Sequence, residues 1–241
     1  MKNKKFLIAI LAFVIVAITA FFAFNARQQE QRISTESLKA AAAAENAQKS
    51  APLQKSTSLK DLQRKTAALH PMDIIETTNQ DAPITFIEYA SYSCSHCGNF
   101  YKNIYPKLKD KYIATGKLKF IFRDFPLDEP SLRASQLVHC LPEESQQGFM
   151  KVLFEKQSSW AYTKDFPEKL ENLAKIAGMP ADDFHACMAD EALEQRILKR
   201  RIEANDAFSV SSTPSFIING QRYSGRNSWK EISAHLDNLL Q

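Results

Sequence analysis

Glycine and cysteine are both scarce in this chain, and each scarcity excludes a class of protein. The 241 residues contain six glycines and ten prolines, which excludes collagen-like and low-complexity architectures. Four cysteines are too few for a disulfide-rich scaffold, although an even number permits pairing. With 44% apolar and 24% charged residues, the chain can bury a core as one large domain or two modest ones.

Most of the chain also lacks an excess of basic residues. Residues 1–70 contain eleven Lys or Arg against four Asp or Glu, whereas residues 71–241 contain twenty against twenty-three. A nucleic-acid-binding domain carries its basic patch on the folded part. We therefore expect no nucleic-acid partner.

The N-terminus has the pattern of a membrane segment. Lysines within residues 2–5 precede an apolar run of nineteen residues, Phe6–Phe24, in which only Thr19 is polar. As a helix this run spans about 28 Å, close to the thickness of the bilayer hydrocarbon. No convincing cleavage site follows, so residues 1–24 are predicted to be an uncleaved signal anchor, with a cleaved signal peptide as the alternative. Either reading exports the rest of the chain to an oxidising compartment.

Residues 25–70 are predicted to be a linker rich in Ala, Lys and Gln. Near its end, over residues 58–69, apolar positions recur at the a and d spacing of a heptad: Leu59, Leu62, Thr66 and Leu69. Two heptads leave several interpretations open. This helix packs on its own domain, forms a solvated stalk, or makes the chain a homo-oligomer.

From Met72 onward the pattern is that of an α/β domain. Strands are predicted at 72–75, 83–89 and 117–122, with a helix over 97–114 that Pro106 kinks. Five helical segments follow, then a hairpin and a last helix: 130–141, 143–154, 166–177, 182–188 (with Asp182 as N-cap), 191–208, the hairpin strands 215–219 and 221–224, and 227–240. This order predicts an α/β domain with a helical insertion.

The most informative motif is Cys94-Ser95-His96-Cys97, directly after a buried strand and at the start of a helix. Unpaired N–H groups and the helix dipole at this point favour an anion, so Cys94 is predicted to be a thiolate and Cys97 to be shielded. A partly protonated His96 adds positive potential. Stabilising the reduced form makes the disulfide a stronger oxidant. We predict redox chemistry.

Two other readings of this motif stay open. A zinc site needs further ligands, for which His139-Cys140 and His185-x-Cys187 are the candidates. The second alternative is an inert structural disulfide.

Two further features support redox chemistry. Pro214 begins a predicted strand, and in the cis form it would turn the backbone of Thr213 toward its neighbours; an ordinary trans proline is the alternative. Glu88 interrupts an apolar strand six residues before Cys94. A buried carboxylate there could take the Cys97 proton, whereas a salt bridge at the sheet rim is the simpler interpretation.

Three segments together resemble the DsbA family of thiol-disulfide oxidoreductases. They are Phe-Ile-Glu-Tyr-Ala-Ser-Tyr-Ser-Cys-Ser-His-Cys (86–97), Phe-Arg-Asp-Phe-Pro-Leu (122–127) and Ser-Ser-Thr-Pro-Ser-Phe-Ile-Ile-Asn-Gly (211–220), and the likeness extends from about Met72 to Leu240. The resemblance implies a thioredoxin fold with a helical domain inserted between strand 3 and the C-terminal hairpin. The expected parts are residues 71–125, the insertion 126–208 and residues 209–241.

The resemblance also implies roles for individual residues. Cys94 is the nucleophile, Cys97 the resolving cysteine, His96 the residue that tunes the potential, Glu88 the buried acid, and Thr213 with the cis-proline Pro214 the substrate contact. Ser95 stands where the best-known members carry proline.

The remaining cysteines, Cys140 and Cys187, both fall in the predicted insertion. We favour a structural disulfide between them, as the resemblance suggests, with two free buried thiols as the alternative. Such a bridge closes a loop of about 48 residues, worth about 4 kcal/mol in the chain-entropy model.

Three hypotheses for function follow. The first is an oxidase that gives its disulfide to reduced exported proteins and is reoxidised by a DsbB-like membrane partner. It would work on the periplasmic side of a bacterial inner membrane, anchored by residues 6–24, or soluble in the periplasm if the segment is cleaved. The second is an oligomeric disulfide isomerase or a mixed enzyme, and the third a non-catalytic metal- or peptide-binding module. We expect no cofactor and no bound metal.

Overall fold

The computed structural model describes residues 61, 63–64 and 67–241. The predicted membrane segment at residues 6–24, the linker up to residue 60 and half of the predicted helix 58–69 lie outside the described residues. Among the residues that are described, no helix is long and apolar enough to cross a membrane. The membrane anchor therefore stays a prediction.

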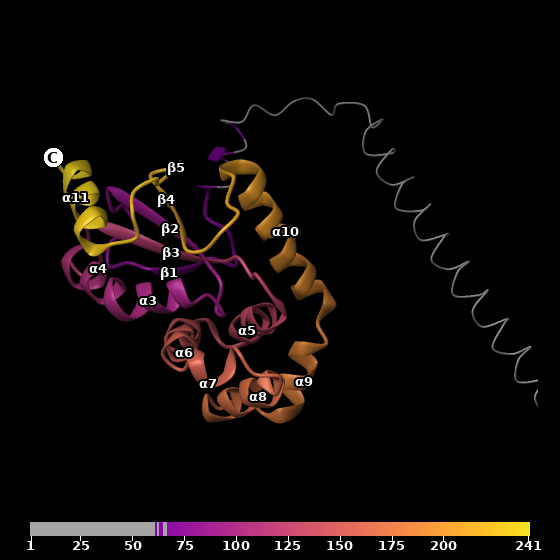
Figure 1. The fold of residues 1–241 in the computed structure, drawn as a ribbon. Helices are drawn as coiled ribbons and strands as arrows, with labels where there is room; N and C mark the ends of the chain where they lie inside the picture. Colours follow the sequence, from indigo (N-terminus) through magenta and orange to yellow (C-terminus); the bar gives the residue numbers. More distant parts are fainter. Residues whose placement is uncertain (1–60, 62, 65–66) are drawn as a thin grey trace, which may run out of the picture. The chain divides into compact units, whose positions relative to one another are not determined.

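A five-stranded mixed sheet forms the centre of the described part of the chain (Figure 1). Its strands lie in the order β1-β3-β2-β4-β5. The pair β2 and β3 is parallel, and the other neighbouring strands are antiparallel. The strands are β1 (Ile74–Glu76), β2 (Ile84–Ala90), β3 (Leu118–Asp124), β4 (Ser215–Ile218) and β5 (Gln221–Arg222). The strand that leads into the cysteine motif is thus in the middle of the sheet.

Both faces of the sheet are buried, because β2 and β3 carry apolar residues at consecutive positions. On one face Phe86 packs on Phe216, with ring centroids 5.1 Å apart, and Phe100 of α3 (Ser95–Asn103) packs on Phe216 at 5.0 Å. The other face buries Ile87 in a second cluster with residues of α10 (Glu191–Phe208). Two apolar layers therefore hold the central strands in place.

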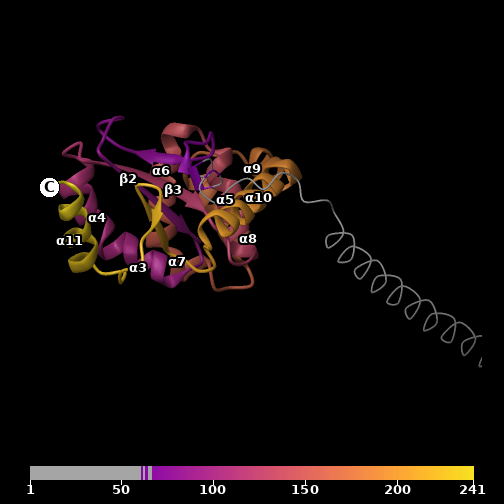
Figure 2. The same ribbon diagram turned by 90° about the horizontal axis from the view of Figure 1, so that it is seen from above.

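Six helices separate β3 from β4 in the described chain, where the sequence predicted an insertion of five. In Figure 1, α5–α9 gather at one end of the sheet and α10 returns alongside it, and Figure 2 shows α4 and α11 at the opposite end of the domain. The helices are α5 (Glu129–Cys140), α6 (Glu143–Glu155), α7 (Gln157–Trp160), α8 (Phe166–Ile176), α9 (Ala181–Met188) and α10, and α11 (Trp229–Leu239) follows the hairpin. This is a thioredoxin-like fold with a helical insertion.

The helix predicted over residues 97–114 is divided in the structure. It consists of α3, α4 (Tyr105–Leu108) and the π-helix η1 (Lys109–Ile113). Pro106 lacks an N–H group and lies in the first turn of α4, where that group would have no partner. The break therefore falls at Ile104, two residues before the proline.

Two predictions about the insertion are wrong or incomplete. Asp182 is not an N-cap: α9 begins at Ala181 after Pro180, and the Asp182 carboxylate lies in the first turn, where the helix dipole favours it. The short helix α7 was not predicted, because four residues carry no readable hydrophobic period. This unpredicted helix contacts the cysteine motif.

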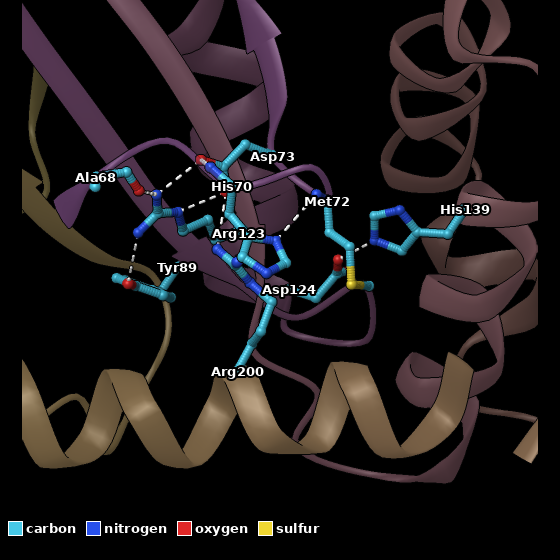
Figure 3. A network of polar contacts seen from close by, with 9 residues as sticks. All are labelled: Ala68, His70, Met72, Asp73, Tyr89, Arg123, Asp124, His139 and Arg200. Atoms are coloured by element: carbon cyan, nitrogen blue, oxygen red, sulfur yellow. Dashed lines mark hydrogen bonds and ion pairs between the residues drawn. The ribbon is translucent and has the colours of Figure 1, made fainter. Parts of the chain in front are cut away.

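A buried ion-pair network fixes the point where the chain enters the sheet (Figure 3). Arg123 of β3 is 1% exposed, and its Nε and Nη2 each donate to a different Asp73 carboxylate oxygen at 2.7 Å. Arg200 of α10 donates to the same carboxylate at 2.8 Å. The Arg123 guanidinium also donates to the Ala68 carbonyl at 2.8 Å and to the Tyr89 hydroxyl at 3.2 Å. Residues 68–73 are thereby tied to both β3 and α10.

Candidate active site

The cysteine motif begins where β2 ends and α3 starts. Cys94 occupies the N-cap position of α3 with extended backbone, φ −73° and ψ 117°. Its carbonyl accepts the first helical hydrogen bond from the Gly98 N–H at 3.0 Å. The backbone N–H groups of His96 and Cys97 in the first turn lie close enough to the sulfur of Cys94 to stabilise its anion. The local sequence thus puts the first cysteine at the positive end of a helix.

The two cysteines of the motif are free thiols with opposite acidities. A hydrogen bond from the Cys97 thiol, with smaller contributions from Thr213 and the two backbone N–H groups, lowers the pKa of Cys94 to about 5. Partial burial opposes this shift but does not cancel it. Cys94 is therefore a thiolate at neutral pH, as predicted from its position.

Cys97 lies one turn deeper and is fully buried. Burial raises its pKa well above the ordinary value of a thiol, and the hydrogen bond to Cys94 and the nearby carboxylate of Glu88 act in the same direction. Cys97 is therefore a protonated donor that faces the anion of Cys94.

The Thr213–Pro214 peptide bond is cis. It precedes β4, and the Thr213 carbonyl accepts a hydrogen bond from Cys94 Sγ at 3.3 Å when that sulfur is protonated. The two segments that the sequence analysis singled out separately thus meet at one sulfur atom.

Glu88 lies in the middle of β2, fully buried and opposite Phe216 of β4. Neither carboxylate oxygen has a hydrogen-bond partner within the described residues. The structure therefore has no salt bridge at the sheet rim for this residue. Burial, and next the negative charge of Cys94, raise the pKa of Glu88 well above its usual range.

His96 is exposed, and it stabilises the Cys94 anion through its backbone N–H. The predicted contribution was that of the imidazole ring. The ring itself is exposed to solvent, and its role in tuning the potential stays a prediction.

Two residues of the insertion hold the loop before Cys94, and the sequence analysis missed both. The Ser131 hydroxyl of α5 accepts from the Tyr92 N–H at 2.9 Å and from the Ser91 hydroxyl at 2.8 Å. Gln157 of α7 donates through Nε2 to the carbonyls of Tyr92 at 2.7 Å and Cys94 at 2.9 Å. No sequence signal identifies these residues, because their partners lie 39 to 65 residues away in the chain.

Cys140 and Cys187 are joined by a disulfide, with an S–S distance of 2.06 Å and Cα atoms 6.0 Å apart. Both sulfurs are thus used in this bond and are not the zinc ligands of the alternative interpretation. His139 instead contacts the buried Asp124 at 2.6 Å (Figure 3). Within the described chain, no three His, Cys, Asp or Glu side chains are grouped as metal ligands.

The fold and the site together define a thioredoxin-fold protein with a helical insertion and a reduced C-x-x-C pair beside a cis-proline. A family model described as thioredoxin matches residues 71–238. Alpha-DsbA1 of Wolbachia pipientis is 32% identical, with a TM-score of 0.67 over 73% of this chain and 95% of that one. The chain therefore belongs to the thioredoxin family, among its DsbA members.

Two curated relatives are consistent with this assignment. A Rickettsia felis protein with the provisional name of protein-disulfide oxidoreductase is 28% identical over 68% of this chain and 59% of its own length. Disulfide bond formation protein D of Bacillus subtilis is 25% identical over 67% of this chain and 74% of its own length. The chain thus spans about 60% of the length of the first of these relatives.

Proposed function

We propose that this protein is a thiol-disulfide oxidoreductase that introduces disulfide bonds into reduced protein substrates through Cys94 and Cys97. The observation that carries this proposal is the pair of opposite pKa shifts, down to about 5 at Cys94 and upward at Cys97. A stabilised Cys94 anion favours the reduced enzyme, so the oxidised enzyme tends to give its disulfide away. The family membership supports the same reaction.

The exchange begins on the oxidised enzyme. A substrate thiolate attacks Cys94 Sγ, an enzyme–substrate disulfide forms, and the bond between Cys94 and Cys97 breaks. Cys97 leaves with the electron pair and takes up a proton, since its thiolate is unstable in its buried position. A second substrate thiolate then attacks the substrate sulfur and expels Cys94. Substrate is oxidised by two electrons, and the enzyme ends as a Cys94 thiolate with a protonated Cys97.

The last step explains why the low pKa belongs to the first cysteine. A thiol of low pKa is the better leaving group in thiol-disulfide exchange. Cys94, with a pKa of about 5, is therefore expelled readily, and the substrate disulfide is released.

Glu88 is the buried acid that we assign to proton transfer at Cys97. Burial raises its pKa well above the usual range of a carboxyl group and so favours its protonated form, and its charge when ionised raises the pKa of Cys97. A protonated Glu88 gives its proton to Cys97 as that sulfur leaves. The reverse transfer accompanies reoxidation.

Thr213 and Pro214 are the residues that we assign to substrate contact. The Thr213 carbonyl lies 3.3 Å from the sulfur that receives the substrate, and the family resemblance implies the same role. An extended substrate segment beside Thr213 would bring its cysteine to Cys94.

We place this reaction on the periplasmic side of a bacterial inner membrane. The lysines at residues 2–5 and the apolar run 6–24 support an anchored, exported chain, and a cleaved segment would leave the domain soluble there. A DsbB-like membrane protein would reoxidise the dithiol after each cycle.

An oligomeric isomerase is the second candidate function. It rests on the a/d pattern over residues 58–69, whose last member, Leu69, is 55% exposed in the described domain. A self-association through this helix would cover that side chain and bring two sites together.

A redox titration of Cys94 and Cys97, run together with oxidation of a reduced, unfolded ribonuclease, tests the proposal. We expect an oxidising potential, loss of substrate thiols in the presence of the oxidised enzyme, and no reaction with Cys94→Ser. A potential as reducing as that of thioredoxin, about −270 mV, would overturn the oxidase assignment. Recovery of activity from scrambled ribonuclease by a dimeric protein would favour the isomerase instead.

A further inference from the structure

The insertion holds the segment that precedes the nucleophile by both of its backbone polar groups. The N–H of Tyr92 donates to Ser131 of α5, and its carbonyl accepts from Gln157 of α7 at 2.7 Å. Gln157 reaches one step further, because its Nε2 also donates to the carbonyl of Cys94 at 2.9 Å. Both N–H bonds of one side-chain amide are therefore used on the C-x-x-C loop.

Gln157 is itself held in place by the packing of its helix. Gln157 is 5% exposed, and it starts the short helix α7. Trp160 of the same helix is fully buried and donates through Nε1 to the Leu153 carbonyl at 3.0 Å. The amide thus belongs to a packed element and is not a flexible surface group.

A glycine makes this close approach to α3 possible. A Cβ atom at Gly98 would lie 2.6 Å from Gln157 Oε1, well inside contact distance. Gly98 is also the residue whose N–H donates to the Cys94 carbonyl at 3.0 Å. That carbonyl therefore receives one bond from the first turn of α3 and one from the insertion.

We propose that Gln157 is a positioning residue for the exchange reaction: its amide fixes the carbonyls of Tyr92 and Cys94 and so keeps the first turn of α3 aimed at the Cys94 sulfur. The inference rests on the proposed function. The backbone N–H groups that stabilise the anion belong to His96 and Cys97, and they lie in the helical turn that begins at the Cys94 carbonyl held by Gln157. Through this amide, the packing of the insertion sets the reactivity of a sulfur in the thioredoxin part.

The test is the pH dependence of Cys94 alkylation in the reduced full-length protein. Gln157→Met keeps the volume and removes both donors, so the midpoint should rise by about one pH unit. Gln146→Met is the matched control: the Gln146 amide donates one bond, to the Leu141 carbonyl at 3.1 Å within the insertion, and its loss should leave the midpoint unchanged. If Gln157 only stabilised the fold, both variants would unfold at a lower temperature, and the alkylation midpoint of Cys94 would stay the same in each.

A second variant covers the case in which Gln157→Met does not fold. Gly98→Ala keeps every hydrogen-bonding group and adds one methyl group that must displace the Gln157 amide. Its alkylation midpoint should therefore also rise, even though alanine is a better helix former than glycine. A midpoint unchanged from wild type in folded Gln157→Met, or in Gly98→Ala, overturns the proposal.

The readout is independent of substrate oxidation. If the wild-type protein fails to oxidise reduced ribonuclease but Gln157→Met still shifts the midpoint, the proposed function fails and the positioning role stands. If oxidation is observed and the midpoint does not move, the positioning role fails alone.

Discussion

The carbonyl oxygen of Thr213 lies 3.3 Å from Sγ of Cys94, although 119 residues separate them in the chain. The Cys94 sulfur thus lies between this carbonyl and the first turn of α3. The N–H groups of that turn are the donors that stabilise the sulfur as an anion. Cys94 is half-buried, so the sulfur keeps an open side. The following predictions concern this sulfur and the packing around it.

Alkylation of the reduced protein should follow the ionisation of Cys94. Because only the thiolate reacts, the rate with iodoacetamide should rise through a midpoint near pH 5 and then stay level. Cys97 should stay unmodified because it is fully buried. Mass spectrometry after timed quenching at pH 3–9 measures both.

The variant Cys97→Ala should move this midpoint upward. It removes the hydrogen bond that contributes most to the low pKa of Cys94, while the backbone N–H groups remain. The same alkylation series measures it, and a midpoint in Cys97→Ala equal to that of the wild type would contradict the prediction.

Replacing Glu88 should stabilise the protein at neutral pH. The folded-state pKa of Glu88 is raised, so ionisation favours the unfolded chain as the pH rises above the unfolded value of about 4.5. Glu88→Met should therefore increase the free energy of unfolding by about 2 kcal/mol at pH 7, and by less at pH 4, where both states are largely protonated. Urea unfolding at the two pH values measures the difference.

The variant Glu88→Gln is the control for this pH dependence, since it keeps a buried polar group but cannot ionise. Its advantage over wild type should also shrink as the pH falls toward 4. A loss of stability at pH 7 that exceeds the loss at pH 4 would show that the carboxylate is paired in solution.

The disulfide between Cys140 and Cys187 should contribute about 4 kcal/mol to stability. The two residues are separated by 47 positions, and the double variant Cys140→Ser/Cys187→Ser releases this loop in the unfolded chain. Guanidinium unfolding, with Cys94 and Cys97 reduced in both proteins, isolates the effect. A difference below about 1 kcal/mol would mean that the unfolded chain gains little freedom when the bridge is removed.

Asp73→Asn should be among the most destabilising single changes outside the active site. It leaves Arg123, which is 1% exposed, and Arg200 without the charge that both guanidinium groups contact. Breaking a buried pair costs about 3–5 kcal/mol. Residues 68–73 should also become accessible to proteases, which limited digestion at room temperature measures.

The matched control is Lys111→Met, which removes the exposed bridge to Asp237, where the two side chains are 47% and 46% exposed. This change should leave the free energy of unfolding almost unchanged, because water screens an exposed ion pair. Equal losses in the two variants would contradict the special role of the buried network.

The cysteine site was predictable from sequence because its parts are local. A buried strand, a C-x-x-C and a helix follow one another directly, and each has a readable pattern of apolar residues. The position of Cys94 at the helix terminus follows from that order alone. The fold class was predictable for the same reason, since the alternation of strands and helices is visible along the chain.

The rest of the site depends on contacts that no local pattern encodes. Gln157 and Ser131 act on residues far away in the chain, and their partners are backbone atoms, which any residue type supplies. The bonds of Asp73 to Arg123 and Arg200 likewise join separate elements. The backbone N–H of His96 that acts on Cys94 is likewise a group that any residue at this position supplies.

The sheet order has a consequence for how the enzyme is made. β4 pairs with the central strand β2 but is produced after β3 and all the helices of the insertion, so on the ribosome Cys94 is made long before Thr213 exists. A nascent chain that ends before β4 therefore carries Cys94 without its carbonyl neighbour. The surroundings of this sulfur are completed only when the last strands of the sheet have been made.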